Sequence, residues 1–207
     1  LQAGTSHYFG DGFAKAFDIQ FSNKENKLAY PHQTSWGMTT RLIGAIIMTH
    51  GDDNGLVLPP AVAPIQVIVV PIAQHKEGVL DRANALCDEL KKVCRAKIDD
   101  SENSPGWKFA EYEMKGVPVR VEIGPRDIEN NQCVVVTRHK REKTIVSLDD
   151  ISTVIPQKLQ EVRDGLYKNA LENRERRTYK CKSTDEIIKA LEENGDGFVK
   201  AMWCGSE

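Results

Sequence analysis

Ile65-Gln66-Val67-Ile68-Val69-Val70-Pro71-Ile72 is a nearly continuous apolar run of eight residues. A run of this length, preceded by Pro64, is typical of a central strand that is covered on both faces. A helical pattern from Val79 to about Ala96 follows it, so this part of the chain predicts an α/β domain with a parallel strand at its centre. The core face of that helix is expected to contain Leu80, Ala83, Leu86, Leu90 and Val93.

A second helix is predicted from about Pro105 to Lys115, with Gly116 ending it. Its apolar face is expected to carry Trp107, Ala110 and Met114, which leaves Glu113 outside that face.

A strand is predicted from Val117 to Ile123, where valine and isoleucine alternate with Pro118, Arg120 and Glu122. Because alternate residues of a strand face opposite sides, the charged residues lie on the other side of the sheet from the apolar ones. We therefore expect Arg120 to be presented rather than buried in the core.

The remaining pattern completes a mixed α/β sheet with helices. Strands are expected at Cys133–Thr137 and Thr144–Leu148, followed by a long helix from Asp149 to about Arg177. Residues 178–207 predict strand, helix and strand, too short to stand alone as a domain.

The first 60 residues have a different character. Ala14–Phe21 alternates apolar and polar residues, which predicts a strand of an antiparallel sheet, and Lys27–Tyr30 is expected to begin its return. The run Met38–Met48 is apolar on nearly every side, which predicts a buried helix starting near Thr39. Pro59 and Pro60 interrupt regular structure, so we place domains at 1–60, 61–165 and 166–207.

Composition limits the function classes. The 28 Lys and Arg against 30 Asp and Glu give a net charge of −2, so any nucleic-acid contact must come from local patches. The five cysteines have no regular spacing and no apolar run reaches the length of a membrane span, which favours a reducing cytoplasmic setting without membrane association. Because Leu1 rather than Met opens the chain, we expect a piece of a longer protein.

Thr39 and Arg41 stand at the predicted start of a helix, where free N–H groups favour anionic ligands. A nucleoside triphosphate fits such a place, because arginine pairs with phosphate and stacks on aromatic rings. The alternative is that Thr39 merely caps the helix and Arg41 is solvated, although a cation in the first turn opposes the helix dipole. Gln2, Thr5 and His7 form a second polar cluster beside Gly4, which alone indicates little.

The stretch His32–Pro60, with its core Ser35-Trp36-Gly37-Met38-Thr39-Thr40-Arg41, resembles motif 3 of the prolyl-tRNA synthetases of the archaeal and eukaryotic-like type, a class II aminoacyl-tRNA synthetase family. Ala63–Val67 and Gly106–Asp127 likewise resemble that family's anticodon-binding domain. The fold that this implies is the end of an antiparallel catalytic sheet, then an α/β anticodon-binding domain, then part of a small C-terminal α+β domain.

The resemblance also implies a function. The whole enzyme would activate L-proline with ATP and Mg²⁺ to prolyl-adenylate, transfer it to tRNA(Pro), and act as a homodimer. This chain would hold no catalytic residue and be inactive alone. The implied ATP-binding residues are Gln2, Thr5, Thr39 and Arg41. The implied proline-binding residues are His7, Ser35, Trp36 and Gly37. The implied readers of the anticodon guanines are Glu113, Arg120 and Arg126. Cys204 would be the first of four zinc ligands, the other three lying beyond this chain, so no zinc is expected in it.

Other interpretations remain at this point. Glu113 and Arg120 could form an ordinary surface ion pair worth about 0–1 kcal/mol. The basic stretch 138–143 could meet a tRNA backbone or be a solvated hairpin tip. The chain could also be a non-enzymatic tRNA-binding module, whereas a zinc enzyme would need ligand clusters that the sequence lacks.

Overall fold

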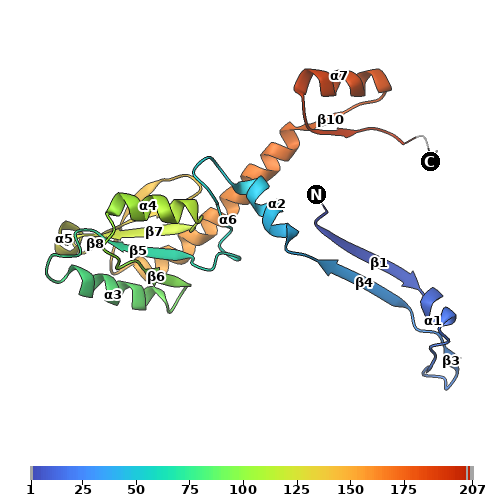
Figure 1. The fold of residues 1–207 in the computed structure, drawn as a ribbon, viewed down its shortest axis with the longest axis horizontal. Helices are drawn as coiled ribbons and strands as arrows, with labels where there is room; N and C mark the ends of the chain where they lie inside the picture. The colour runs from blue at the N-terminus through green and yellow to red at the C-terminus, as the bar shows by residue number, and fades with distance from the viewer. Residues whose placement is uncertain (1, 204, 206–207) are drawn as a thin grey trace. The chain divides into compact units, whose positions relative to one another are not determined.

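The computed structural model describes residues 2–203 and 205, which fold as two compact units, Leu1–Thr49 and His50–Glu207. The first unit is built on β1, which pairs with β4 in an antiparallel ladder from Gly4↔Met38 to Gly10↔Gln33. Figure 1 shows this long two-stranded ribbon at the blue end of the chain. The elements of this part are β1 (Gly4–Gly10), α1 (Gly12–Ala16), β2 (Phe21–Ser22), β3 (Leu28–Ala29), β4 (Gln33–Met38) and α2 (Arg41–His50).

One expectation for the first unit, the strand at Ala14–Phe21, was wrong. The predicted strand Ala14–Phe21 is instead α1 followed by a turn at Asp18, whose φ is 50°, and then β2. An ion pair of 2.8 Å between Lys15 and Asp11, one helical turn apart, stabilises α1 against the alternating pattern. The predicted return is confirmed, because β3 pairs with β2.

The apolar run Met38–Met48 does contain a helix, but the helix is not buried. No residue of α2 is fully covered, and the side chain of Met48 is 78% exposed. The expectation failed because the described part of the first unit consists of two-stranded ribbons and short helices, and none of these forms a layer over α2.

The second unit contains a five-stranded mixed sheet in the order β6-β5-β7-β8-β9. β5 is parallel to both β6 and β7, whereas β8 and β9 continue the sheet antiparallel. All five residues of β5 are buried, which confirms the apolar run as an interior parallel strand of the sheet. The strands are β5 (Val67–Pro71), β6 (Ala96–Ile98), β7 (Val119–Ile123), β8 (Gln132–Thr137) and β9 (Lys143–Ser147).

Helices cover both faces of this sheet (Figure 1). On one face, α3 and α6 pack over Val67, Val119 and Val135 and their neighbours, forming the larger core. On the other face, Phe109 and Tyr112 of α4 pack beside Ile68. The helices of the second unit are α3 (Val79–Leu90), α4 (Pro105–Met114), α5 (Pro125–Glu129), α6 (Ile151–Arg176) and α7 (Thr184–Asn194).

Two helix assignments need correction. α3 ends at Leu90 rather than near residue 96, so Val93 is 44% exposed and the short strand β6 follows. On α4, the face toward the sheet carries Lys108 rather than Trp107 and Met114, which are half exposed. Lysine is a polar residue in any apolar pattern, and the burial of Lys108 depends on Asp99 and Gln74, which lie outside α4.

The last part of the chain follows the long helix α6. β10 (Thr178–Lys180) and β11 (Phe198–Lys200) pair in parallel, with α7 between them. Within the described residues, no helix combines the length and hydropathy needed to cross a membrane.

Gly116 ends α4 with φ of 71°, and a Cβ at this position would lie 2.6 Å from Cβ of Leu56 and 2.7 Å from its carbonyl carbon. Gly78 has a similar φ of 77°, but nothing lies within 4 Å of a Cβ there. We expect Gly78→Ala to cost only the left-handed backbone penalty, about 1 kcal/mol. Gly116→Ala adds a backbone clash and should cost about 2 to 3 kcal/mol in total. Urea unfolding of both variants tests this, and equal costs would contradict the close packing of Leu56.

Candidate functional site

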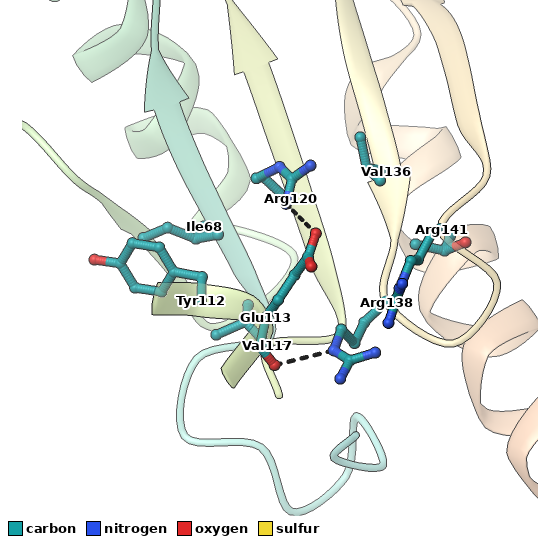
Figure 2. A pocket seen from close by; sticks show the side chains of 9 residues that line it. Ile68, Tyr112, Glu113, Val117, Arg120, Val136, Arg138 and Arg141 are labelled. Carbon is teal, nitrogen blue, oxygen red and sulfur yellow. Dashed lines mark hydrogen bonds and ion pairs between the residues drawn. The ribbon is translucent and has the colours of Figure 1, made fainter. Parts of the chain in front are cut away.

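The residues Glu113 and Arg120 meet in a small hollow between the end of α4 and strands β5, β7 and β8 (Figure 2). Its free volume is about 10 Å³, which is the space of a single water molecule. The lining residues are Ile68, Tyr112, Glu113, Val117, Arg120, Val136, Thr137, Arg138 and Arg141.

Arg120 is buried, with only 8% of its surface exposed, which corrects the expectation that it is presented. It does lie on the face opposite to Val119 and Val121, but α4 covers that face. Its guanidinium stacks on the ring of Phe109 at 4.0 Å. Because the Arg120 guanidinium is buried, its charge requires partners within the protein.

Those partners are two carboxylates. Arg120 donates from Nε to Glu122 at 2.9 Å and from Nη1 to Glu113 at 3.1 Å. One guanidinium between two carboxylates leaves this group with a net charge of −1. Among the described residues, Oε2 of Glu113 accepts no hydrogen bond and Nη2 of Arg120 donates none. The hollow thus contains a spare acceptor beside spare donors.

Such a pair matches the edge of guanine. A carboxylate can accept from N1–H and N2–H of the base, and a guanidinium can donate to its oxygen and ring nitrogen. The free oxygen of the glutamate carboxylate favours a ligand that donates hydrogen bonds. An ordinary surface ion pair would be exposed on both partners, whereas here the arginine side chain is 10% exposed and the glutamate 27%.

Arg126 is not part of this hollow. It lies in α5, beyond the carboxyl end of β7, whereas Arg120 is near the start of that strand. The strand residues between them span roughly 10 Å. Arg126 is exposed, and its guanidinium has no partner among the described residues.

The basic stretch 138–143 is largely neutralised within the molecule. Arg138 is 4% exposed and pairs with Asp52 at 2.6 Å, and Arg141 pairs with the same carboxylate at 3.3 Å. Lys140 pairs with Glu161 of α6 at 3.6 Å. This stretch is therefore a braced hairpin rather than a free cationic tip.

A second hollow, of about 220 Å³, lies in the first unit where β1 begins and β4 ends. It brings together four of the predicted site residues, Gln2, Thr5, Thr39 and Arg41. Gly4 is tightly packed there, because a Cβ would lie 3.2 Å from the carbonyl oxygen of Gly37. Residues far apart in sequence thus meet in one concave place.

Arg41 opens α2, and its backbone N–H donates to Oγ1 of Thr39 at 3.3 Å. The threonine hydroxyl therefore helps to cap the helix, as one of the two interpretations held. The guanidinium of Arg41 is exposed and has no partner among the described residues. It is free to contact an anion beside the helix N-terminus.

The predicted proline-contact residues do not share one face. The ladder pairs His7 with Ser35 and Thr5 with Gly37, which places these four side-chain positions on one side of the ribbon. Trp36 pairs with Ser6 on the other side and is 77% exposed. Ring stacking at 5.5 Å connects His7 with Phe9 on the first side.

Metal ligands are not clustered in the part of the chain that the structure describes, where no group of three His, Cys, Asp or Glu could hold an ion. Cys204 lies outside the described residues. The thiol of Cys181 is buried and lies 3.6 Å from the carbonyl oxygen of Glu186.

Several partners of the residues that line the first hollow were not anticipated. Phe109 lies one helical turn before Glu113, and Glu122 lies two strand residues after Arg120, so both spacings could have indicated a shared face. Asp52 and Arg138 are 86 positions apart, and no local pattern connects them.

Comparisons with known proteins concern the central domain and the chain as a whole. Residues 66–158 match the family model described as the anticodon binding domain. The chain is 59% identical over 205 residues to a protein of Clostridium novyi named Proline--tRNA ligase, with 99% of the chain aligned. Proteins of the same name from Lachnoclostridium phytofermentans and Ruminiclostridium cellulolyticum are 60% and 58% identical over the same length. The chain spans 43% of the length of each of these relatives.

Proposed function

Because the chain belongs to the prolyl-tRNA synthetase family, we propose that the whole enzyme containing it joins L-proline to tRNA(Pro). Proline carboxylate attacks the α-phosphate of ATP, diphosphate leaves, and prolyl-adenylate forms. The prolyl group then passes to the 3′ end of the tRNA, releasing AMP. This chain supplies one side of the ATP and proline sites and the anticodon reader. We place the working enzyme in the cytoplasm as a homodimer.

The division of labour follows the domains 1–60, 61–165 and 166–207. The first is the end of the catalytic domain, the second reads the anticodon, and the third is a linker helix with part of a C-terminal domain. The two compact units and the match at 66–158 support a separate anticodon reader.

In the ATP site, Arg41 contacts the triphosphate or stacks on adenine, while Gln2, Thr5 and Thr39 contribute hydrogen bonds. The 220 Å³ hollow that these four residues line supports this role. Its described lining contains no carboxylate, so Mg²⁺ brought with ATP would be bound through phosphate oxygens and through residues outside this hollow. When bound, the ion neutralises phosphate charge during the attack.

The proline site lies farther along the same ribbon. His7, Ser35 and Gly37 share a face and form the proposed contact with the amino acid. Trp36 lies on the opposite face of the ribbon. It can line the proline pocket as proposed only if the pocket also extends to that face. A zinc ion bound through Cys204 remains a proposal for the whole enzyme alone.

The observation that carries the anticodon role is the buried Arg120 shared by Glu113 and Glu122. It leaves a carboxylate oxygen and guanidinium donors for the edge of one guanine. Arg126, beyond the far end of β7, meets another nucleotide of the same loop. Because the free volume of the hollow is only about 10 Å³, admission of the base edge requires Arg141, which is 46% exposed, to move aside.

Binding of the chain to tRNA(Pro) tests this role. Changing an anticodon guanine to adenine replaces N1–H by an acceptor and removes the N2 amino group, so it should weaken binding about tenfold or more. The control is a guanine-to-adenine change in the acceptor stem with its pair restored, which should have less than about a twofold effect. Equal affinity for both anticodons would overturn the assignment of Glu113, Arg120 and Arg126.

A second candidate is a tRNA-binding module without enzymatic activity. The match of the central domain to an anticodon-binding family favours it for the chain taken alone. The whole enzyme distinguishes the two, because only a synthetase exchanges diphosphate into ATP in a proline-dependent way.

A further inference from the structure

Arg138 occupies the first position after β8 and is one of the most buried charged residues, with a side chain that is 2% exposed. All three of its nitrogens are engaged. Nη1 and Nη2 donate to the two carboxylate oxygens of Asp52 at 2.7 and 2.6 Å, and Nε donates to the carbonyl oxygen of Glu113 at 3.0 Å. Figure 2 shows the bond to Glu113 below the hollow.

The bond to Glu113 fixes the main chain at the end of a helix. α4 ends at Met114, so the carbonyl of Glu113 is among the last four, which lack a partner within the helix. Gly116 N donates to the same oxygen at 3.0 Å. A guanidinium is also favourable at this negative end of the helix dipole. The backbone of Glu113 is thus fixed by Arg138, while its side chain is fixed by Arg120.

Asp52 positions Arg138 in turn. Its carboxylate also accepts from Asn54 N at 2.9 Å and from Arg141, and its backbone bridges to Gly55 in both directions at 3.0 Å. The donors from Arg138 hold the pKa of Asp52 well below its usual range, so the carboxylate is charged at neutral pH.

The segment that follows Asp52 runs along the end of α4. Leu56 N donates to the carbonyl oxygen of Met114 at 3.0 Å, and Leu58 N donates to that of Gly116 at 3.1 Å. A Cβ on Gly55 would lie 2.6 Å from the backbone of Met114. The end of α4 is therefore held by three backbone contacts and by Arg138, with little freedom to shift.

Arg138 lines the hollow, but it is not a ligand for a base or a phosphate. Its guanidinium is already paired with a carboxylate in bidentate geometry and is nearly inaccessible, so an incoming phosphate would first have to displace Asp52. Arg141, which is 46% exposed, is the accessible cation among the residues that line this hollow.

We propose that Arg138, held by Asp52, is a positioning residue that sets the orientation of Glu113 for guanine recognition. This inference rests on the proposed anticodon function. Its measurable consequence is specificity: the carboxylate must meet the donors of guanine within a fraction of an ångström, whereas general attraction to RNA does not depend on that placement.

The test measures the guanine preference, defined as the ratio of Kd for the adenine-changed tRNA to Kd for tRNA(Pro). Arg138→Lys keeps the charge but cannot bind both oxygens of Asp52 and the carbonyl of Glu113, and should reduce the preference about fivefold to tenfold. Asp52→Asn, at a position with a 40% exposed side chain, should reduce it roughly threefold and keeps the test informative if the lysine variant does not fold. The control, Lys140→Ala, removes a charge from the same hairpin without touching Glu113 and should leave the ratio unchanged.

The outcomes separate the inference from the function on which it rests. A merely structural role would lower the melting temperature and weaken both tRNAs alike, leaving the ratio as in the wild type, and that result would overturn the inference. An equal loss in Lys140→Ala would overturn it as well, because charge rather than position would then explain the effect. A wild-type chain without any guanine preference would overturn both the inference and the proposed anticodon role.

Discussion

Replacing Lys108 by methionine is expected to lower the free energy of unfolding by about 3 to 4 kcal/mol, because it removes one partner of a buried ion pair. Lys108 is 1% exposed, and its Nζ lies 3.7 Å from Oδ1 of Asp99. The same nitrogen donates to the carbonyl oxygen of Asp99 at 2.8 Å and to Oε1 of Gln74 at 3.1 Å. Methionine retains the apolar stem but removes the donor to the Asp99 carbonyl oxygen and to Gln74, and leaves the Asp99 carboxylate without its counter-charge.

The loss should depend on pH. Burial raises the pKa of Asp99, but the bonds from Ser101 and the charge of Lys108 outweigh it, so the pKa lies below its ordinary value. A lowered folded-state pKa contributes stability above the unfolded value, about 3.9, and this contribution is lost as the pH falls through the folded value. The difference between wild type and Lys108→Met should therefore shrink below about pH 4.

Urea unfolding followed by circular dichroism at neutral and acid pH measures both effects. The matched control is Lys115→Met on the same helix, where the lysine is 54% exposed and pairs with Glu111 at the surface. That change should cost less than about 1 kcal/mol at any pH. Equal costs at the two positions would show that the buried contacts of Lys108 contribute nothing beyond a surface pair.

Replacing Arg41 by alanine in the whole enzyme is expected to reduce kcat/KM for ATP in proline-dependent diphosphate exchange by about 100-fold to 1,000-fold. Its guanidinium has no partner among the described residues and borders the hollow shared with Gln2, Thr5 and Thr39. Removing a single preorganised cation that meets the developing phosphate charge has effects of this size. The KM for proline should change much less.

Two further variants serve as comparisons for Arg41→Ala. Arg41→Lys retains the charge without the planar fork and should recover only part of the activity. Lys15→Ala removes another exposed charge, which pairs with Asp11 at the start of α1, and should leave exchange within about twofold. If Arg41→Ala were as active as Lys15→Ala, Arg41 would have no role with ATP.

The sequence predicted the strands of the second unit's sheet, but it did not predict that the polar face of the sheet is covered. The apolar run of β5 and the alternation in β7 correspond to buried strands, because period-two patterns reflect the local backbone. The burial of Arg120 could not be read from that alternation. It depends on which helix covers the polar face, and α4 does so with Phe109 stacked on the guanidinium.

The candidate site was also predicted only in part from the sequence. Glu113 and Arg120 were both predicted, from a family resemblance supported by the chemistry of guanine, and the structure brings them within hydrogen-bonding distance. The pairing of Asp52 with Arg138 was not predicted, since this contact joins segments 86 positions apart. Long-range pairs of this kind are determined by the packed fold, and neither spacing nor composition indicates them.

The proposal that Glu113 reads a guanine edge is tested most directly by a double-mutant cycle. Binding of tRNA(Pro) is measured for the wild-type chain and for Glu113→Ala, each with guanine or inosine at each anticodon guanine position, because inosine lacks only the N2 amino group. We predict that inosine at one of these positions weakens wild-type binding about tenfold and weakens Glu113→Ala binding less than about twofold. The same loss for both proteins at every position would contradict recognition by Glu113.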